Sequence, residues 1–206
     1  MAAVVDARRF CVPRVLPLTL TLSLTHGGAV TDAGGAVLLR VHATLLGLLH
    51  RYVLADAAGR PILTVRRKAF TLNSRFEALR GDSWDASRGL LFTAKRWPIF
   101  QVRTQMGVFL ASNRAERACD FTMRCSGFDE RSCDFYLGNS STKIAQVRRH
   151  LSAAGVLLGM EKFSVTVFPN VDYAFIIALI VMLSDIHKAE SDRSRTSTIY
   201  AACSSR

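Results

Sequence analysis

Val171-Asp-Tyr-Ala-Phe-Ile-Ile-Ala-Leu-Ile-Val-Met-Leu-Ser-Asp-Ile186 is apolar without interruption from residue 173 to residue 183. A helix with this sequence has no polar face, so lipid or protein must cover it on every side. Sixteen helical residues span about 24 Å, less than the ~30 Å apolar thickness of a bilayer, and Asp172 and Asp185 shorten the apolar part further. The sequence therefore favours a helix buried in a protein core.

The ends of this helix are also indicated by charge and capping. Asn170 is placed to cap the first turn, and Asp172 lies near the positive end of the helix dipole. His187 and Lys188 lie near its negative end. We therefore predict a helix over residues 170–188.

Short strands precede this helix. Residues 18–24 alternate Leu with Thr or Ser, the period of a half-buried strand, and we prefer this interpretation to a signal peptide that begins at Arg8 and Arg9. Gly, Asp and Asn mark turns between further alternating segments. The predicted strands are 18–24, 29–31, 36–42, 48–55, 62–68, 72–79, 90–96, 106–111, 119–125, 132–137, 142–149 and 163–168.

A sheet of this width normally curls, and a closed barrel has no unpaired edges but has a lumen to fill. The apolar helix fits that lumen. We predict a mainly β protein, a closed barrel of about twelve strands around a buried hydrophobic C-terminal helix. The organisation expected is an N-terminal extension at 1–17, the barrel and its helix at 18–188, and a disordered tail at 189–206, where no apolar face is present.

Composition indicates an anionic partner. The 206 residues include 27 Lys and Arg against 16 Asp and Glu, which gives a net charge of +11. Such a charge suits a membrane surface or a nucleic acid and does not choose between them. Five cysteines, an odd number without zinc-like spacing, predict reduced, structural thiols and a reducing compartment.

The positive charge is concentrated between residues 60 and 103, on strands that should be neighbours. Phosphorylated headgroups need several convergent cations, and arginine can engage two oxygens at once. An equally simple alternative is that these side chains only solvate strand ends and turns. The candidate lipid-binding residues, chosen by charge alone, are Arg66, Arg67, Lys68, Arg75, Arg80, Lys95, Arg96 and Arg103.

One short segment of the sequence resembles a catalytic motif. Gly81-Asp-Ser83 occurs in some serine esterases, but that chemistry needs a strand–turn–helix setting and a downstream Asp-x-x-His, and the sequence has neither. Nucleotide-binding, zinc and calcium motifs are not found either. We therefore expect no enzyme activity, no cofactor and no metal.

Several ordered motifs resemble the plant LURP-one-related family, over about residues 10–188. The motifs are Leu63-Thr-Val-Arg-Arg-Lys68, Ser74-Arg-Phe-Glu-Ala-Leu-Arg-Gly81, Asp129-Glu-Arg-Ser-Cys133, Ile144-Ala-Gln146 and Leu158-Gly-Met-Glu-Lys-Phe-Ser-Val-Thr-Val-Phe-Pro-Asn-Val-Asp-Tyr-Ala-Phe175. The resemblance implies a tubby-like fold, a twelve-stranded barrel around a C-terminal helix, within a superfamily that includes the phospholipid scramblases. Phe76 departs from the tryptophan expected there, and the scramblase cysteine cluster and calcium segment are missing.

The resemblance implies a non-enzymatic, phosphoinositide-binding, membrane-tethered transcription regulator with a role in plant defence. The alternative is a soluble scaffold whose basic face binds acidic proteins or nucleic acid, and a Gly-Asp-Ser esterase is a remote third. We expect a monomer in the cytoplasm, peripheral at the plasma membrane and also nuclear. No lipid-contact motif of the tubby proteins transfers residue by residue.

Overall fold

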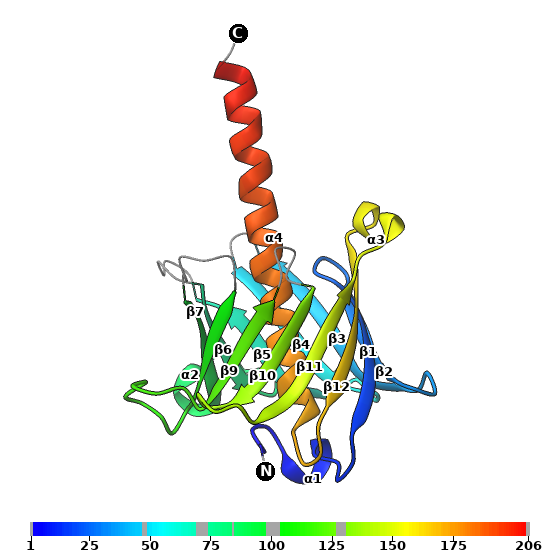
Figure 1. Cartoon of the computed structure of the whole chain (residues 1–206), viewed down its shortest axis with the longest axis vertical. Coiled ribbons are helices and arrows are strands. Elements are labelled where there is room, and N and C mark those ends of the chain that lie inside the picture. Colours follow the sequence, from blue (N-terminus) through cyan, green and yellow to red (C-terminus); the bar gives the residue numbers. More distant parts are fainter. Residues whose placement is uncertain are drawn as a thin grey trace.

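The computed structural model describes residues 2–46, 49–68, 74–83, 85–97, 104–126 and 131–204, with only the backbone at residues 45, 46, 49, 88, 156 and 193–204. Twelve strands form one closed barrel, and helix α4 (Tyr173–Ser204) runs through its centre (Figure 1). The predicted fold class is confirmed. The strands are β1 (Leu16–Ser23), β2 (Gly27–Asp32), β3 (Val37–Leu46), β4 (Leu49–Asp56), β5 (Pro61–Arg67), β6 (Arg75–Arg80), β7 (Leu90–Trp97), β8 (Gln105–Leu110), β9 (Phe121–Ser126), β10 (Ser132–Leu137), β11 (Lys143–His150) and β12 (Met160–Val167).

Each strand pairs antiparallel with the next one along the chain, and β12 pairs with β1 to close the barrel. Alternation places the apolar residues of each strand inside: Leu18, Leu20 and Leu22 of β1 are at most 3% exposed. Three short helices, α1 (Ala7–Phe10), α2 (Ala86–Gly89) and α3 (Ala153–Leu157), lie outside the lumen. Closure removes every free sheet edge, which is why no edge protection is needed.

The inner part of α4 is the filling of the barrel. Every residue from 174 to 183 is at most 1% exposed. Phe175 packs against Phe92 and Phe121, with ring centroids 5.1 and 4.9 Å apart. Among the described residues, no helix combines the length and the apolar character that a membrane crossing requires.

Asp172, not Asn170, caps the helix. The Asp172 Oδ1 atom accepts a hydrogen bond from the Phe175 amide at 3.1 Å, and its main-chain oxygen accepts one from Ile176 at 3.3 Å. Asn170 instead adopts a φ of 60° in the turn before the helix. The prediction of an Asn170 cap is therefore wrong, because the left-handed turn at Asn170 shifts the first helical turn two residues along the chain.

Asp172 also ties the N-terminal segment to the barrel. Its Oδ2 atom accepts hydrogen bonds from the amides of Val5 at 2.8 Å and Asp6 at 3.1 Å. Burial raises the pKa of Asp172, while these backbone donors act in the opposite direction. Phe10, 3% exposed, adds an edge contact with Tyr173. The segment predicted as an extension thus covers the end of the barrel where α4 begins.

The C-terminal prediction needs correction. Residues 189–206 are predicted as a disordered tail, whereas α4 continues to Ser204 and extends beyond the barrel (Figure 1). The segment from His187 to Ser204 contains neither Gly nor Pro, so no residue breaks the helix once the barrel has fixed its first four turns.

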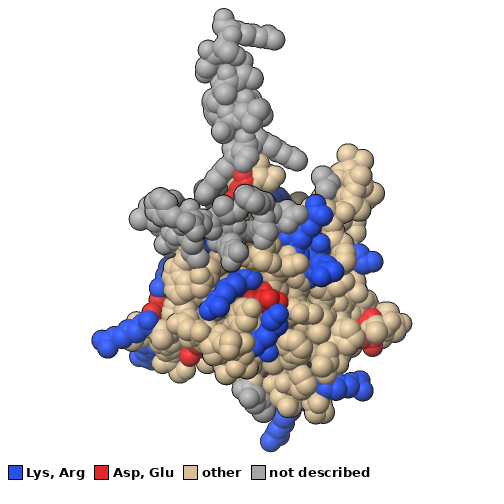
Figure 2. Space-filling model, in the orientation of Figure 1, with Lys and Arg blue, Asp and Glu red and all other residues tan. Residues whose placement is uncertain are grey.

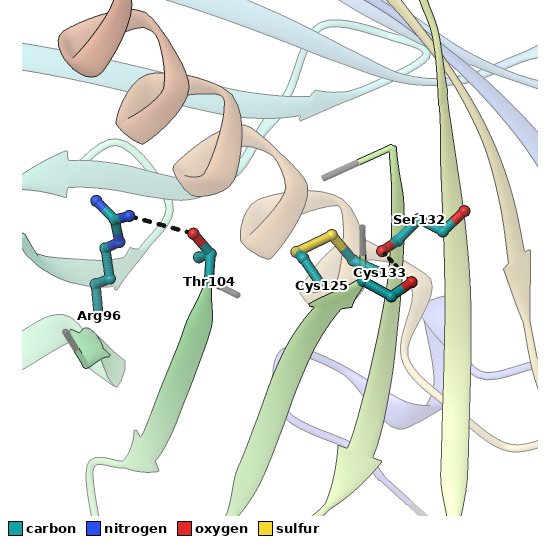
Figure 3. Close-up of a disulfide and its surroundings, with 6 residues drawn as sticks. Arg96, Thr104, Cys125, Ser132 and Cys133 are labelled. Atoms are coloured by element: carbon teal, nitrogen blue, oxygen red, sulfur yellow. Dashed lines mark hydrogen bonds between the residues drawn. A yellow bond between two sulfur atoms is a disulfide. The ribbon is translucent and has the colours of Figure 1, made fainter. Parts of the chain in front are cut away.

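The prediction that all cysteines are reduced is also wrong. Cys125 on β9 and Cys133 on β10 are directly opposite in register, with Cα atoms 3.9 Å apart, and form a disulfide inside the barrel (Figure 3). Cys11 and Cys119 are free. The sequence places the disulfide partners eight residues apart, but only the hairpin register brings their side chains together. Cysteine usage therefore no longer supports a reducing compartment, and the cytoplasmic location stays a prediction.

We predict that Asp172→Ala lowers the free energy of unfolding by about 2–5 kcal/mol, because it leaves buried amides of the N-terminal segment and of α4 without an acceptor. Urea denaturation followed by circular dichroism measures the change. Asp6→Ala is the control: Asp6 caps only the four-residue helix α1, and its loss should cost ~1 kcal/mol or less. Equal costs for the two variants would contradict the role assigned to Asp172.

Candidate anion-binding surfaces

The structure divides the predicted lipid-binding residues among three places. Four of them lie on the outside of β5–β7, two point into the mouth where α4 leaves the barrel, and one lies at the opposite end. Arg103 lies outside the described residues. The outer group is Arg66, Lys68, Arg75 and Lys95, the mouth group is Arg67 and Arg96, and the distant one is Arg80, whose Nη1 lies 3.5 Å from the Val5 carbonyl oxygen.

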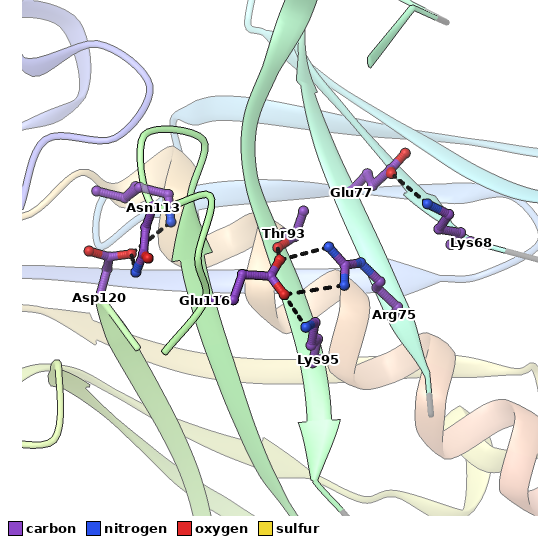
Figure 4. A network of polar contacts seen from close by, with 9 residues as sticks. Lys68, Arg75, Glu77, Thr93, Lys95, Asn113, Glu116 and Asp120 are labelled. Carbon is purple, nitrogen blue, oxygen red and sulfur yellow. Dashed lines mark hydrogen bonds and ion pairs between the residues drawn. The ribbon is translucent and has the colours of Figure 1, made fainter. Parts of the chain in front are cut away.

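The outer group shares its surface with two carboxylates. Glu77 accepts two hydrogen bonds from Arg66, at 2.9 and 2.7 Å, and lies 3.7 Å from the Lys68 amine. Glu116 accepts a hydrogen bond from Arg75 at 2.7 Å and also contacts Lys95 (Figure 4). Each of the four cations therefore has a carboxylate partner, and the two carboxylates cancel half of their charge.

Glu116 is held in this network by three side chains. Burial alone would raise the pKa of its carboxyl, but hydrogen bonds from Lys95 and Arg75 lower the pKa below its usual value. Thr93 adds a third donor at 3.1 Å. The loop between β8 and β9 brings Glu116 here with a φ of 47°, a conformation uncommon outside glycine. The network fixes this loop to the barrel wall.

The mouth group stabilises the exit of α4. Asp185 of α4 is fully buried, accepts a hydrogen bond from the Tyr52 hydroxyl at 2.8 Å and lies 2.5 Å from His50 Nδ1. Arg67 Nη1 lies 3.5 Å from the same carboxylate. Burial, followed by the charge of Asp185, raises the pKa of Tyr52. His50, Tyr52 and Arg67 thus form a polar cluster around the buried carboxylate of Asp185.

Arg96, the other mouth cation, pairs with Glu190 of α4 and donates to the Thr104 hydroxyl at 3.3 Å (Figure 3). A neighbouring depression of about 270 Å³ between α4 and β12 contains Arg149 together with its partner Glu161. Acidic groups therefore accompany the basic ones at the mouth as well.

A second basic surface lies on the outside of β9–β12 and was not predicted as a site. We call it the β9–β12 face and define it by Arg124, Lys143, Arg148, His150 and Lys162, all of them exposed. The strand registers place one carboxylate, Asp134, at an outward position among them. Figure 2, which views this side, shows Lys and Arg side chains spread around a small acidic area over these strands.

The β9–β12 face is also hollowed. A groove of about 530 Å³ runs over β10–β12 and is lined by both hydroxyl and basic side chains. Arg148 lies between Ser132 of β10 and Ser164 of β12 in one row of the sheet. His150 Nε2 lies 2.8 Å from the Ser164 Oγ atom. A cation flanked by hydroxyls provides the donors that bind phosphate oxygens.

The cations of this face are less neutralised than those of β5–β7. Lys143 lies 2.9 Å from Asp134, and this hydrogen bond raises the pKa of Lys143. Among the described residues, Arg148 and Lys162 form no ion pair. The signal was present in the sequence: residues 142–149 and 163–168 were predicted as strands, and polar positions alternate with buried ones in the observed β11 and β12. The density of charge along the chain did not reveal this face, because its basic residues come from three different strands, β9, β11 and β12.

The comparisons with known proteins agree with this architecture. The sequence profile of the LURP-one-related family matches residues 19–185. This chain belongs to the LURP-one-related family. The resemblance found in the sequence motifs is thereby confirmed.

Individual LURP-one-related relatives match most of the chain. Protein LURP-one-related 15 of Arabidopsis thaliana is 40% identical over 191 residues, which cover 91% of this chain and 87% of the relative. Protein LURP1 of the same plant is 37% identical over 190 residues, covering 90% and 91%. An X-ray structure of an Arabidopsis thaliana protein superposes with a TM-score of 0.69 at 36% identity, covering 91% of this chain and 99% of that one.

We predict that Glu116→Gln lowers the free energy of unfolding by about 1–2 kcal/mol at neutral pH, because two cations lose their carboxylate partner. The pKa of Glu116 is lower in the folded chain, so its ionised form stabilises the fold above about pH 4 and this contribution disappears as the pH falls through the folded pKa. Denaturation of the native protein and the variant should therefore differ at pH 7 and converge in acid.

Thr93→Val is the graded comparison for this pH dependence. It removes only one of the donors that lower the pKa of Glu116, so its cost should be smaller than that of Glu116→Gln and should also shrink in acid. A Glu116→Gln cost that persists unchanged in acid would show that the carboxylate charge contributes nothing.

Proposed function

We propose that this LURP-one-related protein is a non-catalytic protein that binds phosphorylated inositol lipids through the β9–β12 face. The observation that carries the proposal is the groove on this face, where exposed Arg148 and His150 lie beside the hydroxyls of Ser132 and Ser164. Several phosphates on one headgroup require several donors within a small area, and arginine can bind two phosphate oxygens together.

The comparison of the two basic surfaces favours β9–β12. On β5–β7, each of the carboxylates Glu77 and Glu116 pairs with two cations, so an incoming phosphate must compete with them. On the β9–β12 face, the outward carboxylate Asp134 pairs with Lys143 and leaves Arg148 and Lys162 exposed to solvent. A phosphate there replaces water and counterions instead of a protein carboxylate.

The wider role follows the family resemblance and is part of the proposal. A barrel that binds membrane lipid and is released from it would act as a membrane-tethered regulator of transcription in plant defence. The overall charge of +11 supports association with an anionic surface. Monomeric state and nuclear entry stay predictions. Binding of nucleic acid by the same cations is the alternative, and it differs in its dependence on salt.

The test compares full-length variants in co-sedimentation with phosphatidylcholine vesicles, with and without a multiply phosphorylated inositide, at physiological salt. We expect the native chain to bind only the inositide vesicles. Arg148→Glu with Lys162→Glu should weaken this binding by about tenfold or more, because both reversals repel the headgroup. The melting temperature should hardly change, since exposed charges contribute little to folding.

Arg14→Glu with Arg114→Glu is the matched control, because both residues are exposed, lie outside the β9–β12 face and give the same change in net charge. An equal loss of vesicle binding in the two pairs of variants would show that binding depends only on the overall charge. A third pair, Arg66→Glu with Lys68→Glu, tests the outer surface predicted from sequence, and a loss confined to that pair would move the site to β5–β7. Duplex DNA that displaces the vesicles at physiological salt would favour nucleic acid instead.

A further inference from the structure

The most exposed apolar side chains of the described structure gather in one place. Six large hydrophobic residues stand out from the surface, and four of them lie in residues 151–160, the connection between β11 and β12 together with the first residue of β12, which we call the α3 loop. Leu157 and Leu158, at 87% and 66%, are the two most exposed of the six, and Leu151 and Met160 are 44% and 42% exposed. An apolar group held this far out in water normally has a partner.

The α3 loop is a folded turn that holds these side chains outward. The Ser152 hydroxyl accepts a hydrogen bond from the Gly155 amide at 3.0 Å, and the Leu158 amide donates to the Ala154 carbonyl at 3.0 Å. A Cβ atom at Gly155 would lie 2.8 Å from the Met160 carbonyl oxygen, so glycine allows the close packing of α3 on β12. Leu157 and Leu158 are therefore presented by a defined backbone.

Basic side chains lie directly beneath this tip. His150 ends β11 immediately before the loop, and the register pairs it with Lys162 of β12. Arg148 lies one outward position further down β11. The nearest carboxylate in sequence, Glu161, pairs with Arg149 and belongs to the mouth of the barrel. Segments that lie at an anionic membrane interface typically combine apolar side chains with adjacent cations, as this loop does.

We propose that the α3 loop inserts Leu157 and Leu158 into the apolar boundary of an anionic membrane, while Arg148, His150 and Lys162 remain at the level of the headgroups. The proposal rests on the lipid binding proposed above. It adds how deeply the protein enters the membrane and how the barrel is oriented on it. Charge complementarity favours a lipid surface over a protein groove, because the cations on the β9–β12 side of the tip match the uniform negative sign of such a surface.

The course of α4 sets the orientation. The helix leaves the barrel at the end where α3 also projects (Figure 1), and its next residues, Glu190, Ser191 and Asp192, are polar or acidic. These groups are costly in an apolar layer. A membrane lying across the mouth would have to accommodate them, whereas a membrane along the β9–β12 face meets the α3 tip and the basic groove together. The barrel therefore lies on its side, with the axis of α4 parallel to the membrane surface.

The test uses the full-length chain and vesicles of phosphatidylcholine with a multiply phosphorylated inositide. Leu157→Ser with Leu158→Ser should lower the partition coefficient by about tenfold or more, because two buried side chains are lost from the lipid. Val15→Ser with Leu137→Ser is the matched control, since these residues are 47% and 46% exposed and lie outside the α3 loop. The control pair should bind as the native chain does.

Two further measurements separate insertion from headgroup binding. Binding of soluble inositol hexakisphosphate should be unchanged in the leucine pair and reduced by Arg148→Glu. Leu157→Trp should show a blue-shifted emission on vesicles and quenching by brominated acyl chains.

If the leucine pair binds vesicles as the native chain does, insertion is refuted and lipid binding by the groove stands. If the native chain binds neither vesicles nor the soluble probe, the proposed function fails and the insertion with it. A leucine pair that loses a purified protein partner but keeps full vesicle binding would assign the loop to that protein.

Discussion

Burial of α4 in the lumen of the barrel is the interaction on which the rest of the structure depends. Residues 174–183 have no face that tolerates water, and a twelve-stranded barrel without them would enclose a large apolar void. Each fully buried Leu, Ile, Val, Phe or Met side chain contributes about 1.5–3 kcal/mol relative to exposure in water. Helix and barrel are therefore stable only together. Because the core lies inside the barrel, the side chains on its outer surface can serve binding.

The polar ends of the buried segment fix its position along the barrel axis. Asp172 gathers backbone donors from the N-terminal segment at one end, and Asp185 is held by Tyr52 and Arg67 at the other. A buried carboxylate is costly unless donors surround it, so sliding of the helix by one turn would remove both sets of partners. Specific placement thus comes from the two carboxylates, whereas the apolar residues between them supply most of the stabilisation.

The two basic surfaces show why a count of charges along the chain is a poor guide to a binding site. The stretch rich in Lys and Arg folds onto β5–β7, where Glu116 comes from a loop and pairs with both Arg75 and Lys95. The β9–β12 face has fewer cations per residue of sequence, yet Arg148 and Lys162 stay exposed and share a surface with hydroxyl groups. Electrostatic attraction for a phosphate depends on the charge left after local pairing, which is a property of the folded surface.

The sequence by itself determined the barrel and its filling, because apolar alternation and an all-apolar segment of limited length are local patterns that only a few architectures can bury. It also identified the family through ordered motifs. Tertiary structure alone decided which residues meet: Asp172 with Val5, Cys125 with Cys133 and Glu116 with Arg75. It also decided that α4 continues past His187, because a helix started inside the barrel propagates through a polar segment that would not start a helix alone. Strand register and loop paths set these contacts, and no local pattern in the chain specifies them.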